Sequence, residues 1–293
     1  MIYQNFIKKI DDTTFEKYKG TTFNESWYET IINKDSDGYY IDLQGNRQVL
    51  FKFRKGLVSN ELMELASNIF LQESKKKHPN RGIAAGIKEG QKNARIYTKT
   101  GQNEGQYVSS NIFGYYDRPL REHRKYFKTI KVCRKTAFNI KHPLEWDKSL
   151  PFISRCSSIY KKLGGRYYNL QKKEWDSINN NLKIPNSVFT TITANYNWRT
   201  SCHKDKGDYS LGLGNLVVVG NNFTGGYLGF PQFKVLIAIK PGDFLLMDVH
   251  QWHCNTAISI GTNGYRLSFV MYIRNDMNMC KNVKIVDSVK YYH

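Results

Sequence analysis

Five short apolar segments follow one another after Asn186, and Gly, Asn or Pro separates each from the next. They read SVFTTITANYN, NLVVVG, KVLIAIK, DFLLMDV and YRLSFVMYI. Short segments with turn residues between them are typical of antiparallel strands, and many such strands at close spacing form a sandwich or a barrel. We therefore expect an α+β protein with a β-sandwich or barrel as its core, against which the helix-containing half packs.

The chain before these segments mixes helical and irregular patterns. Apolar residues recur at helical spacing after Ser59, which predicts a helix that ends near residues 75–77. A second helix is expected to begin at Pro151, and a short one near residues 170–178. Residues 49–56, VLFKFRKG, alternate as a strand does.

These patterns divide the chain into four parts. The expected order is a mixed, partly helical N-terminal extension (residues 1–80), basic loops with supporting helices (81–185), the β core (186–275) and a basic C-terminal tail (276–293). Residues 81–275 are expected to form one compact domain.

Basic residues are in large excess. Lys and Arg number 44 against 25 Asp and Glu, which gives a net charge of +19. Such a charge attracts polyanions, so nucleic acid is the expected partner and an anionic membrane is the weaker alternative. The 20 Tyr, 16 Phe and 5 Trp add faces on which bases stack. A merely soluble surface is the remaining interpretation, and no protein partner is implied.

A glycine-containing basic stretch lies between residues 81 and 99. Its cations suit a loop laid along DNA phosphates, although a solvated charged face explains the pattern equally well. The candidate backbone contacts are Arg81, Lys88, Lys92, Arg95 and Lys99.

The start, MIYQNFIKKIDD, lacks the apolar run of a signal peptide, and no later run approaches the roughly 18 apolar residues of a membrane span. We therefore expect an intracellular protein without membrane attachment, in the nucleus, or in the cytoplasm if the source is viral or bacterial. The five cysteines include no C-x-x-C pair, so a thiolate zinc site is not indicated.

His203 and Asp205 are two residues apart, so on an extended chain both side chains point to one side. A mononuclear iron(II) site that activates oxygen needs two imidazoles and one carboxylate, with further positions open. His253 and His250 compete for the third place, and their opposite parity on a strand lets only one of them face inward. We favour His253 because it follows a turn and a strand and directly precedes a new strand. A structural histidine is the alternative for either.

The last apolar segment alternates in a way that draws attention to Arg266. Leu267, Phe269 and Met271 fall on one face, whereas Arg266 and Ser268 fall on the other. An arginine on the inward face of a barrel needs an anionic partner, because an unpaired buried charge is very costly. A dicarboxylate cosubstrate meets that need.

An H-x-D, a histidine after a G-D turn and an R-x-S thirteen residues later resemble the 2-oxoglutarate and iron(II)-dependent dioxygenases. More narrowly, the chain looks like the TET/JBP branch, through SSNIFGYYDR, CRKTAF, FTTITANYNWRTSCHKDKGD and GGYLGFPQFKVLIAIKPGDFLLMDVHQWH. The resemblance implies a double-stranded β-helix, or jelly-roll, core. It also implies an enzyme that uses Fe(II), 2-oxoglutarate and O2, with iron on His203, Asp205 and His253. Arg266, with Ser268, would bind the distal carboxylate of 2-oxoglutarate, and Asn195 is a further contact.

Members of this branch oxidise the 5-methyl group of pyrimidines in DNA, so the resemblance implies a flipped 5-methylpyrimidine as substrate. Asp208 would accept a hydrogen bond from the cytosine amino group, while Arg274 donates to N3 and O2 and Tyr272 stacks on the ring. Asn111 is a further candidate by position. The familiar animal members have Asn and His where this chain has Asp208 and Arg274, so base specificity is not simply inherited.

The expected reaction is hydroxylation of 5-methylcytosine to 5-hydroxymethylcytosine, with further oxidation open. Thymine is the alternative base, which would give 5-hydroxymethyluracil, and a salt bridge between Asp208 and Arg274 is the alternative to base reading. An oxygenase acting on RNA, on a nucleotide or on protein side chains is a second hypothesis. A DNA-binding module that has lost catalysis is a third, which the complete triad and Arg266 disfavour.

Overall fold

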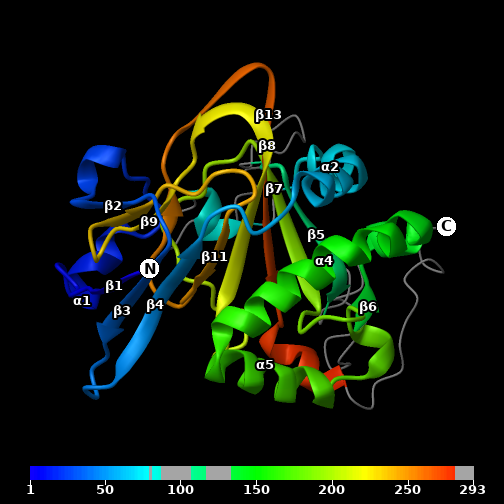
Figure 1. Ribbon diagram of the computed structural model, residues 1–293, viewed down its shortest axis with the longest axis horizontal. Helices are drawn as coiled ribbons and strands as arrows, with labels where there is room; N and C mark the ends of the chain where they lie inside the picture. Colours follow the sequence, from blue (N-terminus) through cyan, green and yellow to red (C-terminus); the bar gives the residue numbers. More distant parts are fainter. Residues whose placement is uncertain (79–80, 87–106, 117–132, 281–293) are drawn as a thin grey trace, which may run out of the picture.

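The computed structural model describes residues 1–78, 81–86, 107–116 and 133–280. Two β-sheets dominate these residues (Figure 1). The larger sheet has nine strands in the order β1 (Ile2–Asn5), β3 (Ser36–Ile41), β4 (Arg47–Arg54), β11 (Phe244–Met247), β8 (Gly214–Gly225), β13 (Ile258–Tyr272), β7 (Thr191–Tyr196), β5 (Ser110–Tyr116) and β6 (Arg134–Lys135). The smaller has four, in the order β12 (Cys254–Asn255), β9 (Leu228–Phe230), β10 (Val235–Ile237) and β2 (Thr30–Ile32).

The two sheets share an apolar core. The larger sheet contributes side chains of β4, β8 and β11 to it, and the smaller sheet contributes those of β2, β9 and β10. Successive residues of a strand point to opposite faces, and β8 follows this rule because Leu216 and Val218 face the shared core while Val217 and Val219 face away from it. The described strands therefore form the sandwich that their sequence predicts.

Helices cover the other face of the larger sheet (Figure 1). They are α2 (Asn60–Ser74), α3 (Ala137–Lys141), α4 (Pro143–Gly164) and α5 (Arg166–Ser177). Phe70 of α2 lies edge-on to Phe113 and Phe269 of the sheet, with ring centroids 4.7 and 5.5 Å apart. The shorter elements are α1 (Asp12–Phe15) and the 3₁₀ turns η1 (Glu16–Tyr18), η2 (Glu25–Trp27), η3 (Gly82–Ala85), η5 (Asn180–Leu182) and η6 (Asn275–Cys280).

The helix limits agree with the sequence at α2 and differ at α4 and α5. The expected start of α4 at Pro151 is wrong, since the helix begins at Pro143 and Pro151 lies inside it. A proline in the first turn loses no helical hydrogen bond, whereas one in the interior does. Apolar burial on both sides of Pro151, at Trp146 and Phe152, offsets that loss. α5 likewise begins at Arg166, earlier than expected.

Residues 1–80, expected as an extension, are built into both sheets. β4 pairs with β11, placing Phe51 opposite Met247, and β2 pairs with β10, placing Ile31 opposite Leu236. The pattern of residues 1–80 predicts only the strand that becomes β4, and it does not predict the partners of these strands, because β10 and β11 lie far along the sequence. The other expected boundaries stay predictions, and most of the expected tail lies outside the described residues.

Within the described part of the chain, no helix has both the length and the apolar character needed to cross a membrane.

Candidate active site

Two histidines lie opposite each other just before β12, an edge strand of the smaller sheet. The backbone N–H of His203 donates to the carbonyl of His253 at 3.1 Å, and the N–H of His253 donates back at 3.0 Å. This reciprocal pairing sets the two residues directly opposite each other, and their ring centroids are 4.4 Å apart. His250 takes no part in this pairing, and its backbone N–H bonds to the side chain of Asp248 instead.

The backbone orients both rings. Nδ1 of His203 lies 2.7 Å from the carbonyl oxygen of Ser201, and Nδ1 of His253 lies 2.9 Å from that of Gln251. A carbonyl oxygen only accepts, so Nδ1 carries a proton in each ring. In the neutral form of each ring Nε2 therefore has the lone pair, and this is the atom that can bind a metal.

Asp205 completes a three-ligand set. Its two carboxylate oxygens lie 3.4 Å from Nε2 of His203 and 3.6 Å from Nε2 of His253. Metal–nitrogen bonds of about 2 Å put two ligands of one ion roughly 3 Å apart, so these separations fit a single ion after a small contraction. Within the described ranges, no other group of three metal-binding side chains converges in this way.

The charges of the three groups depend on one another. Burial would raise the pKa of Asp205, but the hydrogen bond and the charge of His203 outweigh burial and hold it below its usual value. Asp205 in turn raises the pKa of His203 against the effect of burial. Burial, and then the charge of His203, lower the pKa of His253 to about 4. Asp205 and His253 are thus deprotonated at neutral pH, as metal ligands must be.

The N-terminal part of the chain supports this set. Gly20 N–H donates to the carbonyl of Cys202, and Cys202 N–H donates to that of Thr21, at 2.9 and 2.7 Å. The Lys204 ammonium lies 3.2 Å from the carboxylate of Asp12. Residues 202 and 204, on both sides of His203, are therefore held by residues 12–21, which lie almost 200 positions earlier in the sequence. The sequence alone did not predict these contacts.

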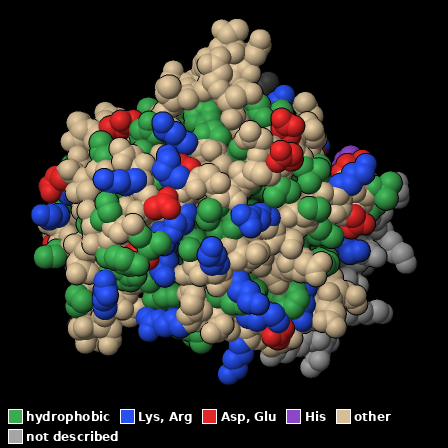
Figure 2. Space-filling model, in the orientation of Figure 1, with side chains coloured by type: hydrophobic (Ala, Val, Ile, Leu, Met, Phe, Trp, Pro, Cys, Tyr) green, Lys and Arg blue, Asp and Glu red, His purple; other side chains and the backbone are tan. Residues whose placement is uncertain are grey.

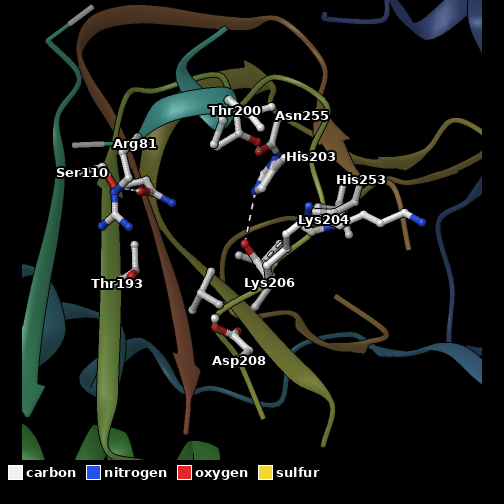
Figure 3. Close-up of a pocket in the computed structure, with 18 of the residues that line it drawn as sticks. Arg81, Ser110, Thr193, Thr200, His203, Lys204, Lys206, Asp208, His253 and Asn255 are labelled. Atoms are coloured by element: carbon white, nitrogen blue, oxygen red, sulfur yellow. Dashed lines mark hydrogen bonds and ion pairs between the residues drawn. The ribbon is translucent and has the colours of Figure 1, made fainter. Parts of the chain in front are cut away.

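A cavity of about 570 Å³ opens beside the three groups. His203, Asp205 and His253 line it together with polar side chains of β5, β7 and β13, namely Ser110, Thr193, Asn195, Ser268 and Tyr272. In Figure 3, Arg81, Ser110 and Thr193 lie across the cavity from His203 and His253. This volume lies within the usual range for a small-molecule or cofactor site.

Arg266 is only 1% exposed and is not itself among the residues that line the cavity, but it contacts the backbone next to one that does. Its Nη2 donates to the carbonyl of Gly226 at 2.9 Å, and Asn255, a cavity residue, donates to the same oxygen at 3.2 Å. Nε and Nη1 of Arg266 are buried with no hydrogen-bond partner among the described residues. Burial lowers the pKa of Arg266 only to about 10, so the group stays cationic and requires an anion. A carboxylate of a small dicarboxylic acid fits this requirement.

Gly226 makes this position of Arg266 possible. Its φ is +66°, and a Cβ atom there would lie 2.7 Å from Nε and 3.0 Å from Cδ of Arg266. Any larger residue would occupy the space of the arginine side chain.

Asp208, Tyr272 and Arg274 gather at another part of the cavity wall. Asp208 and Arg274 form an isolated backbone bridge, and all three residues line the cavity. The guanidinium of Arg274 lies 4.7 Å from the ring centroid of Tyr116. Burial, and then the charge of Asp205, raise the pKa of Asp208 well above its usual value, although Arg274 opposes this shift. The structure thus brings together the three residues that the sequence suggested for base recognition.

Two other expected contacts lie in different places. Asn195 lines the cavity, where its side-chain oxygen accepts from Ser110. Asn111, the neighbouring residue on β5, points elsewhere because its Nδ2 donates to the carbonyls of Ser74 and Lys76 near the end of α2. Its expected contact with the base is therefore corrected to a structural role.

Arg81 is the principal cavity residue whose position differs from expectation. It was expected on DNA phosphates, yet it lines the cavity and its Nε and Nη2 are buried with no hydrogen-bond partner among the described residues. Its charge acts on both Asp205 and Asp208. In the sequence it was one cation among many, so no local signal separated it from its neighbours. The other expected phosphate contacts, Lys88, Lys92, Arg95 and Lys99, lie outside the described residues.

Comparison with known proteins agrees with this arrangement. The Tet_JBP family model, described as the oxygenase domain of the 2OGFeDO superfamily, matches residues 121–275. The bifunctional helicase and thymine dioxygenase JBP2 of Leishmania tarentolae is 28% identical over 267 residues, which are 84% of this chain and 23% of that protein. The thymine dioxygenase JBP1 of Trypanosoma brucei brucei is 32% identical over 184 residues, which are 62% of this chain and 21% of that protein. The chain thus spans less than a quarter of the length of these relatives.

Among solved structures, NgTET1 in complex with 5mC DNA superposes with a TM-score of 0.53 at 16% sequence identity, covering 88% of this chain and 85% of that one. At this identity the likeness concerns the fold. Together with the family match, it confirms the expected jelly-roll core with supporting helices.

Proposed function

This chain belongs to the Tet_JBP family of oxygenase domains in the 2OGFeDO superfamily, and from that membership we propose that it hydroxylates the 5-methyl group of a pyrimidine in DNA. The superfamily consists of dioxygenases that use Fe(II), 2-oxoglutarate and O2. One observation carries the proposal. Two imidazole Nε2 atoms and a carboxylate converge on the wall of a cavity, and the buried Arg266, with two unpaired nitrogens, shares a carbonyl acceptor with the cavity residue Asn255.

His203, Asp205 and His253 would hold the iron. Two imidazoles and one carboxylate suit Fe(II) and leave the other coordination positions open. When bound, iron with 2-oxoglutarate and O2 supplies the oxidation that converts a methyl C–H bond to C–OH, while 2-oxoglutarate becomes succinate and carbon dioxide. The carbonyls of Ser201 and Gln251 keep the two rings in the correct tautomer and orientation.

Arg266 would bind the distal carboxylate of 2-oxoglutarate, with Ser268 and Asn195 as neighbouring polar contacts. The guanidinium is already held by the Gly226 carbonyl, so little side-chain freedom is lost when the carboxylate binds. Arg81 adds a second cation with unpaired nitrogens on the cavity wall, which would bind another anionic group of the substrate or cosubstrate.

DNA as the substrate polymer is supported by the structural neighbour NgTET1, which was solved in complex with 5mC DNA, and by the net charge of +19. The methylated base must leave the helix to reach the cavity. Asp208 and Arg274 would bind its edge while Tyr272 stacks on its ring, and these three side chains lie together on the cavity wall.

For the base itself we propose 5-methylcytosine, because an acceptor at Asp208 and a donor at Arg274 match its amino group and its N3 and O2 atoms. Thymine is the second candidate, since both relatives described above are named thymine dioxygenases. The raised pKa of Asp208 bears on this choice because a protonated carboxyl both donates and accepts, which allows pairing with either base.

Nucleoside mass spectrometry tests the proposal. The purified protein is incubated with Fe(II), 2-oxoglutarate and duplex DNA, with and without 5-methylcytosine, and His203→Ala serves as the control. We expect 5-hydroxymethylcytosine from the methylated duplex and none from the control. Formation of 5-hydroxymethyluracil instead would assign thymine as the base. Succinate release without either product would move the substrate outside DNA and contradict the proposal.

A further inference from the structure

A second cavity, of about 240 Å³, lies on the helix-bearing side of the molecule, away from the metal-binding residues. It is formed where β3 and β4 approach the junction between α4 and α5, in the lower part of Figure 1. Three cations line it, Arg47, Lys52 and Arg166, together with Tyr39 and Tyr167. No Asp or Glu is among the described side chains that line it. Figure 2 shows Lys and Arg side chains spread over this face of the molecule.

Arg47 is available to a ligand. Its guanidinium carbon lies over the Tyr39 ring, 3.8 Å from the ring centroid, and no hydrogen bond or ion pair joins its side chain to any described residue. The negative face of the ring attracts the cation, and this contact uses none of its N–H donors. This arrangement leaves donors free at the cavity.

Arg166 is fixed but not neutralised. Its Nη2 donates to the side-chain oxygen of Gln48 at 2.7 Å and to the hydroxyl of Tyr167 at 3.1 Å, and both acceptors are uncharged. The same tyrosine ring lies 4.9 Å from the guanidinium. The side chain is thus held in one position with its full positive charge.

Lys52 adds a third charge with little compensation. Its Nζ donates to the carbonyl of Leu163 at 2.9 Å and lies 3.9 Å from Asp37. Asp37 is committed to Arg54, whose Nη1 lies 2.7 Å from its other carboxylate oxygen. The charges around the cavity therefore sum to an excess of positive charge, which a bound anion would balance.

The size and shape of this cavity select the anion. At about 240 Å³ it lies below the roughly 300–1,000 Å³ of pockets that enclose a whole small molecule, so it suits a single group. A backbone phosphodiester and a carboxylate both offer two charged oxygens to an arginine, and a phosphate that is part of a polyanion is also attracted by the net positive charge of the chain. One face of each tyrosine ring lies against an arginine, which removes that face from base stacking.

We propose that this cavity, lined by Arg47, Lys52 and Arg166, binds a phosphate group of a nucleic acid backbone at a site separate from the metal centre. The phosphate chemistry rests on the cavity alone, whereas the choice of DNA as its source rests on the proposed function. The site would hold a stretch of DNA backbone that does not carry the base under oxidation.

The experiment measures binding of the 293-residue chain to an unmethylated duplex that contains only G·C pairs. Such a duplex has no 5-methyl group, so it cannot present a substrate base to the other cavity. Affinity is measured by fluorescence anisotropy between 0.05 and about 0.2 M salt. The test variant is Arg47→Ala/Arg166→Ala. The control, Arg155→Ala/Lys161→Ala, removes the same charge from the nearby surface of α4, and neither of its residues lines the cavity.

Each phosphate contact contributes about 0.9 to the slope of log affinity against log salt concentration. We therefore expect the test variant to lose about 0.9 of slope relative to the control, so that its deficit grows about 3.5-fold between 0.2 and 0.05 M salt. Arg47→Ala alone breaks no hydrogen bond with a described residue, so it should fold normally and show part of the loss.

Calorimetric titration with inorganic phosphate separates the two sources of the group. If phosphate binds to the wild type and not to the test variant while the duplex slopes agree, the site holds a free phosphate or nucleotide, and its assignment to a DNA backbone is wrong. If the slopes agree and phosphate binds to neither protein, the proposal fails. The hydroxylation assay is read independently, so formation of 5-hydroxymethylcytosine alongside unchanged slopes rejects this cavity and leaves the proposed function intact.

Discussion

Replacing Gly226 by alanine tests how Arg266 is held. The new Cβ would lie 2.7 Å from Nε and 3.0 Å from Cδ of Arg266, closer than any van der Waals contact allows. Because Gly226 also has a φ of +66°, alanine is strained there by about 1–2 kcal/mol. The least costly response is for the arginine side chain to move, which breaks its hydrogen bond to the Gly226 carbonyl.

The size of the effect follows from that bond. A hydrogen bond to a charged group contributes about 1.5–3 kcal/mol, which corresponds to roughly a 10- to 100-fold change in an equilibrium constant. If Arg266 binds 2-oxoglutarate, the concentration of 2-oxoglutarate for half-maximal succinate release should therefore rise by roughly 10- to 100-fold. Binding of the metal ion should change little, because its three ligands lie on other segments.

The assay compares succinate release against 2-oxoglutarate concentration for the wild type, Gly226→Ala and Gly45→Ala. Gly45 has a φ of +82° and no atom within 4 Å of its Cβ position, so this control carries the backbone strain without a displaced neighbour. Thermal melting identifies a temperature at which all three proteins are folded. A 2-oxoglutarate requirement within twofold of the wild type in Gly226→Ala would refute the reasoning about Arg266.

Three further outcomes are expected. The affinity for Mn(II) or Co(II) should fall about tenfold per pH unit below the raised pKa of His203, because the metal displaces one proton from that ring. His253, with a pKa of about 4, should bind a second competing proton only near that pH. Metal titrations between pH 4.5 and 8 check this, and an affinity that does not change with pH contradicts it. Arg274→Ala should reduce the ratio of 5-hydroxymethylcytosine to 5-hydroxymethyluracil formed on duplexes that contain both bases, while the affinity for the metal ion is preserved. An unchanged product ratio would show that this residue does not recognise the base. Gly38→Ala should lower the free energy of unfolding by about 1–3 kcal/mol in denaturant titrations, because its Cβ would overlap the buried ring of Phe51, and an unchanged midpoint would contradict the packing at that position.

The metal-binding set was predictable because its pattern is local. His203 and Asp205 are two residues apart, and the turn and strand before His253, with the new strand directly after it, favoured it over His250. The alternation of β13 likewise separates Leu267 and its partners in the core from the residues on the cavity side. In each case, neighbours in sequence determine which way a side chain points.

Other features depend on contacts between distant segments, which a short window of sequence does not contain. Asn111 and Ser110 are adjacent on β5, yet only Ser110 reaches the cavity, because the end of α2 offers two carbonyls to Asn111. Arg81 faces the cavity because η3 is tied to the metal-binding segment through the bond from Ser201 to Ala84. Pro151 indicated a helix start by its local preference, and burial along the whole of α4 overrode that preference.

The pairing of the N-terminal strands with the last third of the chain has a consequence for synthesis. The Tyr40 hydroxyl donates to Asp248 at 2.8 Å across 208 positions of sequence. At about 5–20 residues per second, a ribosome needs roughly 10–40 s to make the chain between them. During that interval β3 and β4 have been made but lack β11, the strand with which β4 pairs, so their apolar side chains remain exposed to solvent. The metal-binding residues have not all been synthesised, so the metal site cannot yet assemble. Protease resistance of β3 and β4 in nascent chains that end before β11 would contradict this order.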